Sequence, residues 1–325
     1  MRTRVLTADD LDTALPMRAA IDAMRDAFAA LAAGTVIAPP RVHLVEADRT
    51  TLLMAASGAG GRIAKVVNIF PANAARGLTT TTGVVTVIDP DTGHTVGICD
   101  GGALTAIRTG AVAGLATELL ADADASVGAV LGAGGQAWTQ LLAMVCARPL
   151  QQVRVFARDR ERLETFVAAA RQRVDADVVA AASSDEVIDG ADVVSVATSS
   201  TTPVLDGRRL LRGAHVNGVG SFRLAMRELD EHTIRRAGRI VVDLRASALH
   251  EAGELVAARD AGITRAEDWV ELGALLAEPA LGRADGHDVT VFKSVGHAVQ
   301  DLFAARAAID RAEALGVGQT IGLQQ

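Results

Sequence analysis

A glycine-rich turn near the middle of the chain has the residue types and spacing of a dinucleotide site. It reads Val-Leu-Gly-Ala-Gly-Gly-Gln-Ala over residues 130–137, between an expected strand and an expected helix. In such turns the first glycine permits the tight turn, the second lets the backbone approach a pyrophosphate, and a small third residue lets the helix pack closely on the strand. Turns of this kind also arise for packing alone, but their setting here favours cofactor binding. The residues concerned are Gly132, Gly134, Gly135, Gln136 and Ala137.

The end of the next expected strand selects between the two nicotinamide dinucleotides. Enzymes that use NAD usually carry an acid there to bind the ribose 2′-hydroxyl. This chain has Ala157 followed by Arg158, whose guanidinium suits a 2′-phosphate. Arg158 is also consistent with the solvated start of a helix, and Asp159 could still serve the ribose. The charge pattern favours NADP(H), with NAD(H) as the alternative.

Three basic residues before the turn could bind and protonate an anionic substrate. Lys65 shares the apolar face of the expected strand 62–70, where a cation is costly unless it has a task or reaches water. A strand-edge lysine that extends to water is the alternative. Arg108 precedes the apolar stretch 111–120 and is expected to add its charge to a helix N-terminus. Arg41 follows two prolines and is equally consistent with a solvated loop residue.

The elements around the turn predict an α/β fold. Strands and helices alternate, and the near-continuous apolar strands are typical of a doubly wound parallel sheet that is covered on both faces. The expected strands are 126–131, 153–157, 178–181, 193–197, 215–219 and 239–244. The expected helices are 136–147, 160–173 and a short one that opens at 183–186.

The segments before and after this region predict a separate, mixed α+β part. Helices are expected to begin at Thr7 and at Pro16, the second ending near Gly34. From 41 to 98 the chain is rich in Val, Ile and Thr between Gly, Pro and Asn, which is typical of strands and turns, with one turn at 89–93. The tail, 295–315, is expected to be one long helix.

Composition narrows the class of protein. The 325 residues carry a net charge of −7 and only 3% aromatic residues, which argues against a nucleic-acid partner. Two cysteines and seven scattered histidines predict no disulfide scaffold and no metal site. The N-terminus lacks the apolar core of a signal peptide, and stretches such as 111–120 are too short to span a membrane. We expect a soluble, cytoplasmic enzyme.

Several further motifs, in order along the chain, go beyond a generic fold. They are Lys65-Val-Val-Asn68, Pro71-Ala-Asn73, Gly77-Leu-Thr-Thr80, Asp89-x-x-Thr92-Gly93, Asp100, Leu104-Thr105-x-x-Arg108-Thr109, Ala197-Thr198-Ser199, His215-Val-Asn217-Gly-Val-Gly220, Arg227-Glu-Leu-Asp230 and Phe292-Lys293-Ser294-Val295-Gly296. With the glycine turn, they make the chain resemble the ornithine cyclodeaminase/mu-crystallin family over nearly its whole length.

The resemblance implies a homodimer with a Rossmann-type NAD(P)-binding domain at 113–295 and a dimerisation and substrate domain at 1–112 plus 296–325. It implies that Arg41 and Arg108 hold a substrate carboxylate and that Lys65 moves a proton at the reacting atom. Met54 and Phe222 would also face the substrate. Besides Arg108 and the glycine turn, the cofactor residues implied are Thr80, Thr109, Arg158, Thr198, Ser199, Val219, Lys293, Ser294 and Val295.

Two departures from the family pattern bear on the substrate. Ornithine cyclodeaminases carry an acid where this chain has Phe222, and a glutamate two residues before the methionine, where it has Leu52 before Met54. Glu46 and Asp48 lie nearby but out of register. A side-chain ammonium would therefore lose both acidic partners, so ornithine is not the expected substrate.

What remains suits a small amino-acid-derived carboxylate with a C=N bond. We expect an NAD(P)H-dependent reductase of a cyclic ketimine acid, of the pyrroline- or piperideine-2-carboxylate type, that transfers hydride to C=N. One alternative is an ornithine cyclodeaminase, an alanine-type amino-acid dehydrogenase or an N-substituted amino-acid synthase. Another is a mu-crystallin-type protein that binds NADPH and a small hydrophobic carboxylate without turnover.

Overall fold

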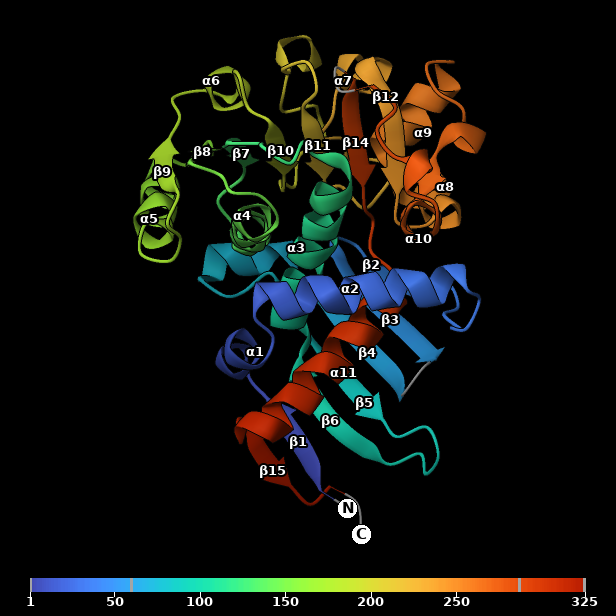
Figure 1. The fold of residues 1–325 in the computed structure, drawn as a ribbon. Coiled ribbons are helices and arrows are strands. Elements are labelled where there is room, and N and C mark those ends of the chain that lie inside the picture. The colour runs from blue at the N-terminus through green and yellow to red at the C-terminus, as the bar shows by residue number, and fades with distance from the viewer. Residues whose placement is uncertain (1, 59–60, 286–287, 324–325) are drawn as a thin grey trace. The chain divides into compact units, whose positions relative to one another are not determined.

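The computed structural model describes residues 2–58, 61–285 and 288–323, and the chain divides into two compact units (Figure 1). The first unit comprises Met1–Arg108 and His297–Gln325, and the second comprises Thr109–Gly296. The sequence places these boundaries at 112/113 and 295/296 instead. The observed boundary at 108/109 and the expected one at 112/113 both fall inside one long helix, α3 (Gly101–Leu120).

The first unit contains a seven-stranded sheet in the order β15-β1-β6-β5-β4-β3-β2. Its strands are β1 (Thr3–Leu6), β2 (Val42–Glu46), β3 (Arg49–Gly58), β4 (Gly61–Ile69), β5 (Thr81–Ile88), β6 (Thr95–Asp100) and β15 (Gln319–Ile321). β1 runs parallel to β6, and the other pairs are antiparallel. The expected turn between β5 and β6 is confirmed, since Asp89 Oδ1 accepts a hydrogen bond from Thr92 N at 2.8 Å.

Helices cover one face of this sheet. α11 (Ala298–Leu315) packs against β3, β4 and β5, and α2 (Met17–Ala32) packs against α11. The helix expected at Thr7 is α1 (Ala8–Ala14), with a capping box between Thr7 and Asp10. The tail helix begins later than the expected residue 295, because Val295 N and Gly296 N donate to the Asp243 carboxylate and Gly296 has φ +83°.

The second unit contains an eight-stranded sheet in the order β13-β12-β14-β11-β10-β7-β8-β9, in which every pair is parallel. Its strands are β7 (Val127–Leu131), β8 (Gln152–Phe156), β9 (Asp177–Ala180), β10 (Val193–Val196), β11 (His215–Gly218), β12 (Ala237–Val242), β13 (Val270–Glu271) and β14 (Val289–Lys293). The doubly wound prediction is confirmed, and all six expected strands are present within two residues at either end. The sequence reading missed β14, a central strand between β11 and β12.

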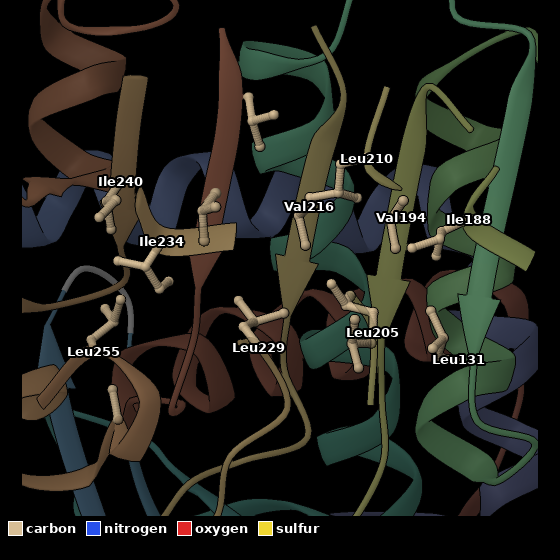
Figure 2. Packing of buried hydrophobic residues seen from close by; sticks show 14 of the residues in the cluster. Leu131, Ile188, Val194, Leu205, Leu210, Val216, Leu229, Ile234, Ile240 and Leu255 are labelled. Carbon is tan, nitrogen blue, oxygen red and sulfur yellow. The ribbon is translucent and has the colours of Figure 1, made fainter. Parts of the chain in front are cut away.

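Helices lie along both faces of this sheet. They are α4 (Gly135–Ala147), α5 (Arg160–Ala170), α6 (Ser184–Ile188), α7 (Glu231–Arg236), α8 (Arg245–Glu251), α9 (Gly253–Asp260) and α10 (Leu272–Ala277). Adjacent strand residues serve opposite faces, as Val193 belongs to the core under α4 and α5, and Val194 to the core on the other side. Figure 2 shows part of the core to which Val194 belongs. Val194 and Val216 extend into it from the neighbouring strands β10 and β11, and Leu229 packs in the same core.

Helix α3 is longer than the expected apolar stretch 111–120. By length and composition its 20 residues could cross a membrane, with a mean hydropathy of 1.2 over the most apolar window. In the structure, however, 67% of that window is buried inside the protein, as in the core helix of a globular protein. The helix thus gives only weak evidence for a membrane span.

Candidate active site

Lys65 lies at the centre of a buried polar cluster in the first unit. It sits on β4 between the buried residues Ile63 and Val67, so it shares their apolar face as the sequence predicts. Its side chain is 1% exposed, and β4 is an inner strand between β3 and β5. The alternative of an edge lysine that extends to water is therefore wrong. Lys65 Nζ instead donates to Asp301 Oδ1 and to Thr105 Oγ1, each at 2.6 Å.

Arg108 joins the same cluster from α3. Its Nε lies 3.3 Å from Asp301 Oδ1, and its Nη1 donates to Gln300 Oε1 at 2.6 Å. Asp301 therefore bridges the ammonium and the guanidinium through one oxygen, from the first turn of α11. The expectation that Arg108 adds to a helix N-terminus is wrong, because α3 begins at Gly101 and Arg108 lies well inside the helix.

The charges of the cluster set its chemistry. Burial lowers the pKa of Lys65 to about 8; the Asp301 charge opposes this shift, and the charges of Arg108 and Arg41 add to it. Burial alone would raise the pKa of Asp301, but the charges of Lys65 and Arg108 outweigh it and hold this carboxyl below its usual range. Arg41 is half-buried and its charge acts on both groups, so it is not simply a solvated loop residue.

The arrangement suits an anion that brings its own hydrogen-bonding groups. Lys65 and Arg108 contact one carboxylate, that of Asp301, and the charge of Arg41 acts on the same group. Asp301 Oδ2 and Gln300 Nε2 are buried and have no hydrogen-bond partner among the described residues. Buried polar atoms are normally paired, so an unpaired acceptor and an unpaired donor beside excess positive charge indicate a polar, anionic ligand.

The neighbouring strand β3 gives this cluster an apolar side. Met54 pairs directly with Lys65 in the sheet register, and Leu52 lies two residues along on the same buried face. Glu46 and Asp48 are both exposed. The two acids that the sequence reading placed out of register therefore do not line this buried face.

Thr80 and Thr109 lie in different units. Thr80 is half-buried in the first unit, just before β5, and its carbonyl oxygen accepts from Phe70 N at 2.8 Å. Thr109 is buried in the second unit on α3, and its carbonyl oxygen accepts from Gln140 Nε2 at 3.2 Å. Their expected contacts with cofactor phosphates stay predictions.

The glycine turn in the second unit has the backbone geometry of a pyrophosphate site. Gly132 has φ +120°, and a Cβ there would lie 2.5 Å from the carbonyl oxygen of Ala197, so only glycine fits. Around Gly134 and Gly135 a Cβ would meet nothing within 4 Å, which leaves the start of α4 open to a ligand. Ala137 is fully buried against the core, and Gln136 Oε1 is buried without a partner among the described residues. These residues fit a dinucleotide.

The loop after β8 carries the residues that would select the cofactor. Arg158 is exposed, and it forms no hydrogen bond or ion pair with any residue that the structure describes. Asp159 is the N-cap of α5, where its Oδ1 accepts from Arg162 N at 3.1 Å. This carboxylate therefore already serves the helix, whereas the Arg158 guanidinium is available to a ligand.

Loops at the carboxyl ends of β10 and β11 hold most of the remaining predicted residues. Thr198 and Ser199 follow β10, while Val219 and Phe222 follow β11. Val219 N donates to Val196 O at 3.0 Å, so the two loops start side by side. Phe222 is half-buried, with the Arg223 guanidinium 5.2 Å from its ring centroid. In doubly wound sheets, ligands bind beyond the carboxyl ends of the strands.

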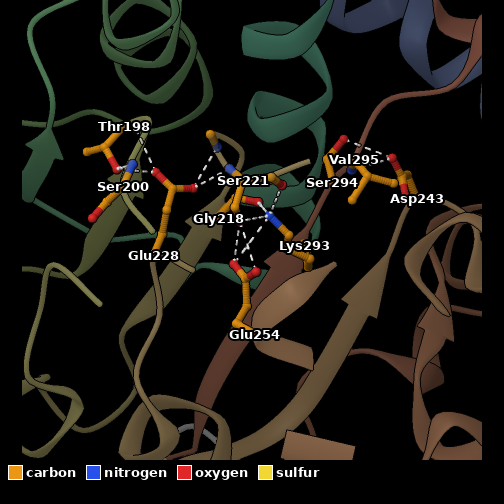
Figure 3. A network of polar contacts seen from close by, with 11 residues as sticks. Thr198, Ser200, Gly218, Ser221, Glu228, Asp243, Glu254, Lys293, Ser294 and Val295 are labelled. Carbon is orange, nitrogen blue, oxygen red and sulfur yellow. Dashed lines mark hydrogen bonds and ion pairs between the residues drawn. The ribbon is translucent and has the colours of Figure 1, made fainter. Parts of the chain in front are cut away.

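The end of β14 carries Lys293, Ser294 and Val295, all buried. Lys293 Nζ donates to Ser221 O and Ser221 Oγ, each at 2.6 Å, and lies 3.3 Å from Glu254 Oε1 (Figure 3). Its charge is thus directed into a buried network. Whether Lys293, Ser294 and Val295 contact the cofactor stays a prediction.

Several polar residues with roles in these clusters were missed by sequence reasoning. They are Asp243, Glu254, Gln300 and Asp301, together with Thr105 and Glu228, which belong to the motifs quoted above but were given no role there. The sequence did hold one signal, since Gln300 and Asp301 interrupt the apolar face of the tail helix next to Val299 and Leu302. Polar residues on a buried helix face require partners, and here these are Arg108 and Lys65.

No group of three or more histidine, cysteine or acidic side chains suitable for a metal ion occurs among residues 2–58, 61–285 and 288–323. His215 is an example of a core histidine. Its ring contacts Thr290 Oγ1 at 2.9 Å and Asn217 Oδ1 at 3.1 Å, and burial lowers its pKa to about 3, so the ring is neutral.

Comparison with known proteins agrees with this geometry. The family model of the ornithine cyclodeaminase/mu-crystallin family matches residues 1–316. The Delta(1)-pyrroline-2-carboxylate reductase of Bacillus cereus is 34% identical over 322 residues, covering 98% of this chain and 99% of that protein. The structure of the Thermococcus litoralis Delta(1)-pyrroline-2-carboxylate reductase with NADH and L-proline superposes with a TM-score of 0.94, at 29% identity, over 98% of this chain and 100% of that one. An archaeal alanine dehydrogenase dimer with bound NAD gives a TM-score of 0.91 at 29% identity, over all of both chains. The chain therefore belongs to the ornithine cyclodeaminase/mu-crystallin family.

Proposed function

We propose that the protein is an NAD(P)H-dependent reductase of a cyclic ketimine 2-carboxylate, such as pyrroline- or piperideine-2-carboxylate. The observation that carries the proposal is the buried cluster of Lys65, Arg108 and Asp301, with the charge of Arg41 beside it. The relatives named as pyrroline-2-carboxylate reductases, one of them bound to NADH and L-proline, support the same substrate class.

Each side chain of the cluster has its own role in the proposed reaction. The guanidinium groups of Arg108 and Arg41 bind the substrate carboxylate, and the low dielectric of the site strengthens this pairing. Lys65 holds a proton at Nζ and delivers it to the ring nitrogen. Asp301 holds Lys65 in place through the 2.6 Å contact. When bound, the reduced nicotinamide supplies the hydride that the C=N carbon receives, and the product is a cyclic amino acid.

The residues at two positions of the family pattern disfavour cyclodeaminase chemistry. Phe222 and Leu52 stand at the two positions where the family's cyclodeaminases carry acids, and Asp301 is already paired with two cations. A substrate ammonium would therefore add a fourth positive charge to this site. The buried face beside Lys65 suits a substrate without a free side-chain amine.

Turnover with a panel of substrates tests the proposal. We expect loss of the reduced-nicotinamide absorbance with a cyclic ketimine acid, little with pyruvate plus ammonia, and no proline from L-ornithine and NAD. Proline formation would indicate a cyclodeaminase, and turnover with pyruvate and ammonia an alanine-type dehydrogenase. Tight binding of NADPH and a hydrophobic carboxylate without consumption of either would indicate a binding protein.

We propose NADP(H) as the preferred cofactor because of the exposed, unpaired Arg158 and the absence of an acid at Ala157. Arg158→Ala should raise the KM for NADPH by about tenfold, since a guanidinium–phosphate pair contributes on the order of 1.5–3 kcal/mol. The KM for NADH should change less than about twofold. Steady-state kinetics with both cofactors measures this, with Arg160→Ala, at the first residue of α5, as control. An equal effect on both cofactors would contradict the assignment.

We propose a homodimer that forms through the uncovered face of the first-unit sheet. Val42, Leu53, Val66 and Val84 pair across β2, β3, β4 and β5, so their side chains make one apolar row. Val42, Leu53 and Val84 are 52%, 38% and 37% exposed. An exposed apolar row on a sheet is typical of a protein interface.

A charge in this row should separate the subunits. Val84→Glu is expected to halve the molar mass measured by light scattering, because an unpaired carboxylate in an apolar interface costs several kcal/mol. Leu315→Glu, at the exposed end of α11, is the matched control and should leave the mass unchanged. A Val84→Glu protein with the wild-type mass would place the interface elsewhere.

A further inference from the structure

Glu228 is a buried carboxylate to which none of the roles above is assigned. It is 0% exposed and lies outside the helices and strands, between β11 and α7. Its Oε1 accepts from Thr198 N at 2.6 Å and from Thr198 Oγ1 at 2.8 Å. Its Oε2 accepts from Gly220 N at 2.7 Å and from Ser221 N at 2.9 Å. Figure 3 shows Glu228 between Thr198 and the Ser221 loop.

The carboxylate thus joins two loops that follow neighbouring parallel strands. Thr198 follows β10, and Gly220 and Ser221 follow β11. The two loops are in direct contact, because a Cβ on Gly220 would lie 2.2 Å from Thr198 O. Ligands of doubly wound sheets bind beyond such carboxyl ends, so the spacing of these loops shapes that part of the site.

We propose that Glu228 is a positioning residue that sets the loops after β10 and β11 for the nicotinamide half of the cofactor. This inference rests on the proposed function, in which Thr198, Ser199 and Val219 face the nicotinamide. Glu228 touches neither cofactor nor substrate in this account. It acts by fixing the backbone of Thr198 and the turn at Gly220.

The hydrogen bonds favour an ionised carboxylate. All four contacts come from N–H or O–H donors, and only acceptor oxygens satisfy them. Burial raises the pKa of Glu228; Lys293 opposes this shift, the Thr198 hydrogen bonds do too, and Glu254 adds to it. Glutamine is therefore an informative replacement, since it keeps the shape but turns an NH₂ group toward two of the donors.

The experiment compares two ligands that differ by the nicotinamide ring. Calorimetry is run with NADH and with ADP-ribose, or with NADPH and 2′-phospho-ADP-ribose if the wild type prefers NADPH. In Glu228→Gln we expect the Kd of the reduced dinucleotide to rise at least about fivefold. The Kd of the ring-less ligand should stay within about twofold, because the glycine turn after β7 holds that part. A merely structural defect would weaken both ligands alike.

Two further variants keep the test interpretable. Glu271→Gln is the matched control, because Glu271 also accepts a backbone N–H, that of Arg245 at 2.9 Å, and should leave both affinities unchanged. If Glu228→Gln does not fold, Glu228→Asp keeps the negative charge but is one methylene too short to reach both loops, and it should weaken NADH alone. Equal weakening of both ligands, or no weakening of NADH, would overturn the inference. A wild-type protein that binds neither ligand would instead refute the proposed function.

Discussion

Replacing Lys65 with methionine should lower kcat for cyclic ketimine reduction by about 10²–10⁴-fold, the usual contribution of general acid catalysis. Methionine has a similar length and suits the buried face between Ile63 and Val67, so the variant should fold. Cofactor binding should be unchanged. Stopped-flow kinetics and NAD(P)H titration measure the two quantities separately. Arg62→Met, on the exposed face of the same strand, is the control.

The wild-type pH profile should report the same group. With its pKa lowered to about 8 by burial, Lys65 loses its proton above that pH. Because the reduction needs the protonated form, kcat/KM should fall tenfold per pH unit on the alkaline side. The limb should be absent in Lys65→Met. A Lys65→Met enzyme that reduces the ketimine near the wild-type rate would contradict the role.

Replacing Asp301 with asparagine should give the largest loss of stability. The change leaves Lys65 and Arg108 buried without their shared counter-charge, a situation that typically costs about 3–5 kcal/mol of unfolding free energy. It should also move the alkaline limb of kcat/KM to lower pH, because the Asp301 charge opposes the lowering of the Lys65 pKa. Urea unfolding and pH-rate profiles measure the two effects.

The stability difference should depend on pH with a definite sign. The pKa of Asp301 is lowered in the folded protein, so its contribution is present above the ordinary carboxyl range and is lost as the pH falls through the folded pKa. The wild-type advantage over Asp301→Asn should therefore vanish in acid. Asp310→Asn, in an exposed pair on the same helix, should have little effect at any pH. A constant difference down to low pH would contradict the charged pairing.

The order of strands and helices along the chain in the second unit could be predicted well from the sequence. The apolar strands and the glycine turn depend on neighbours in the chain, and β7, β8, β10 and β11 are present within two residues of their expected ends. β14 was not predicted because its last two residues, Phe292 and Lys293, belong to a motif that the family resemblance assigns to the cofactor. A strand at the centre of a parallel sheet is defined by its neighbours β11 and β12, which lie far from it in sequence.

The buried polar partners could not be predicted in the same way. Lys65 and Asp301 are 236 residues apart, and only the return of α11 to the first unit brings them together. The cost of a cation on an apolar face indicates a role for Lys65, but that cost does not identify the acid that offsets it. The start of α3 was also misplaced, because the apolar stretch begins after the polar residues Thr105 and Arg108.

The most direct test of the account follows a labelled hydride. The protein is incubated with NAD(P)H that carries deuterium at both C4 positions and with pyrroline-2-carboxylate, and the product is examined by mass spectrometry. We expect proline one mass unit heavier, with the deuterium at C2 and an equal amount of oxidised cofactor. Unchanged substrate, or proline without deuterium, would contradict hydride transfer to the C=N carbon.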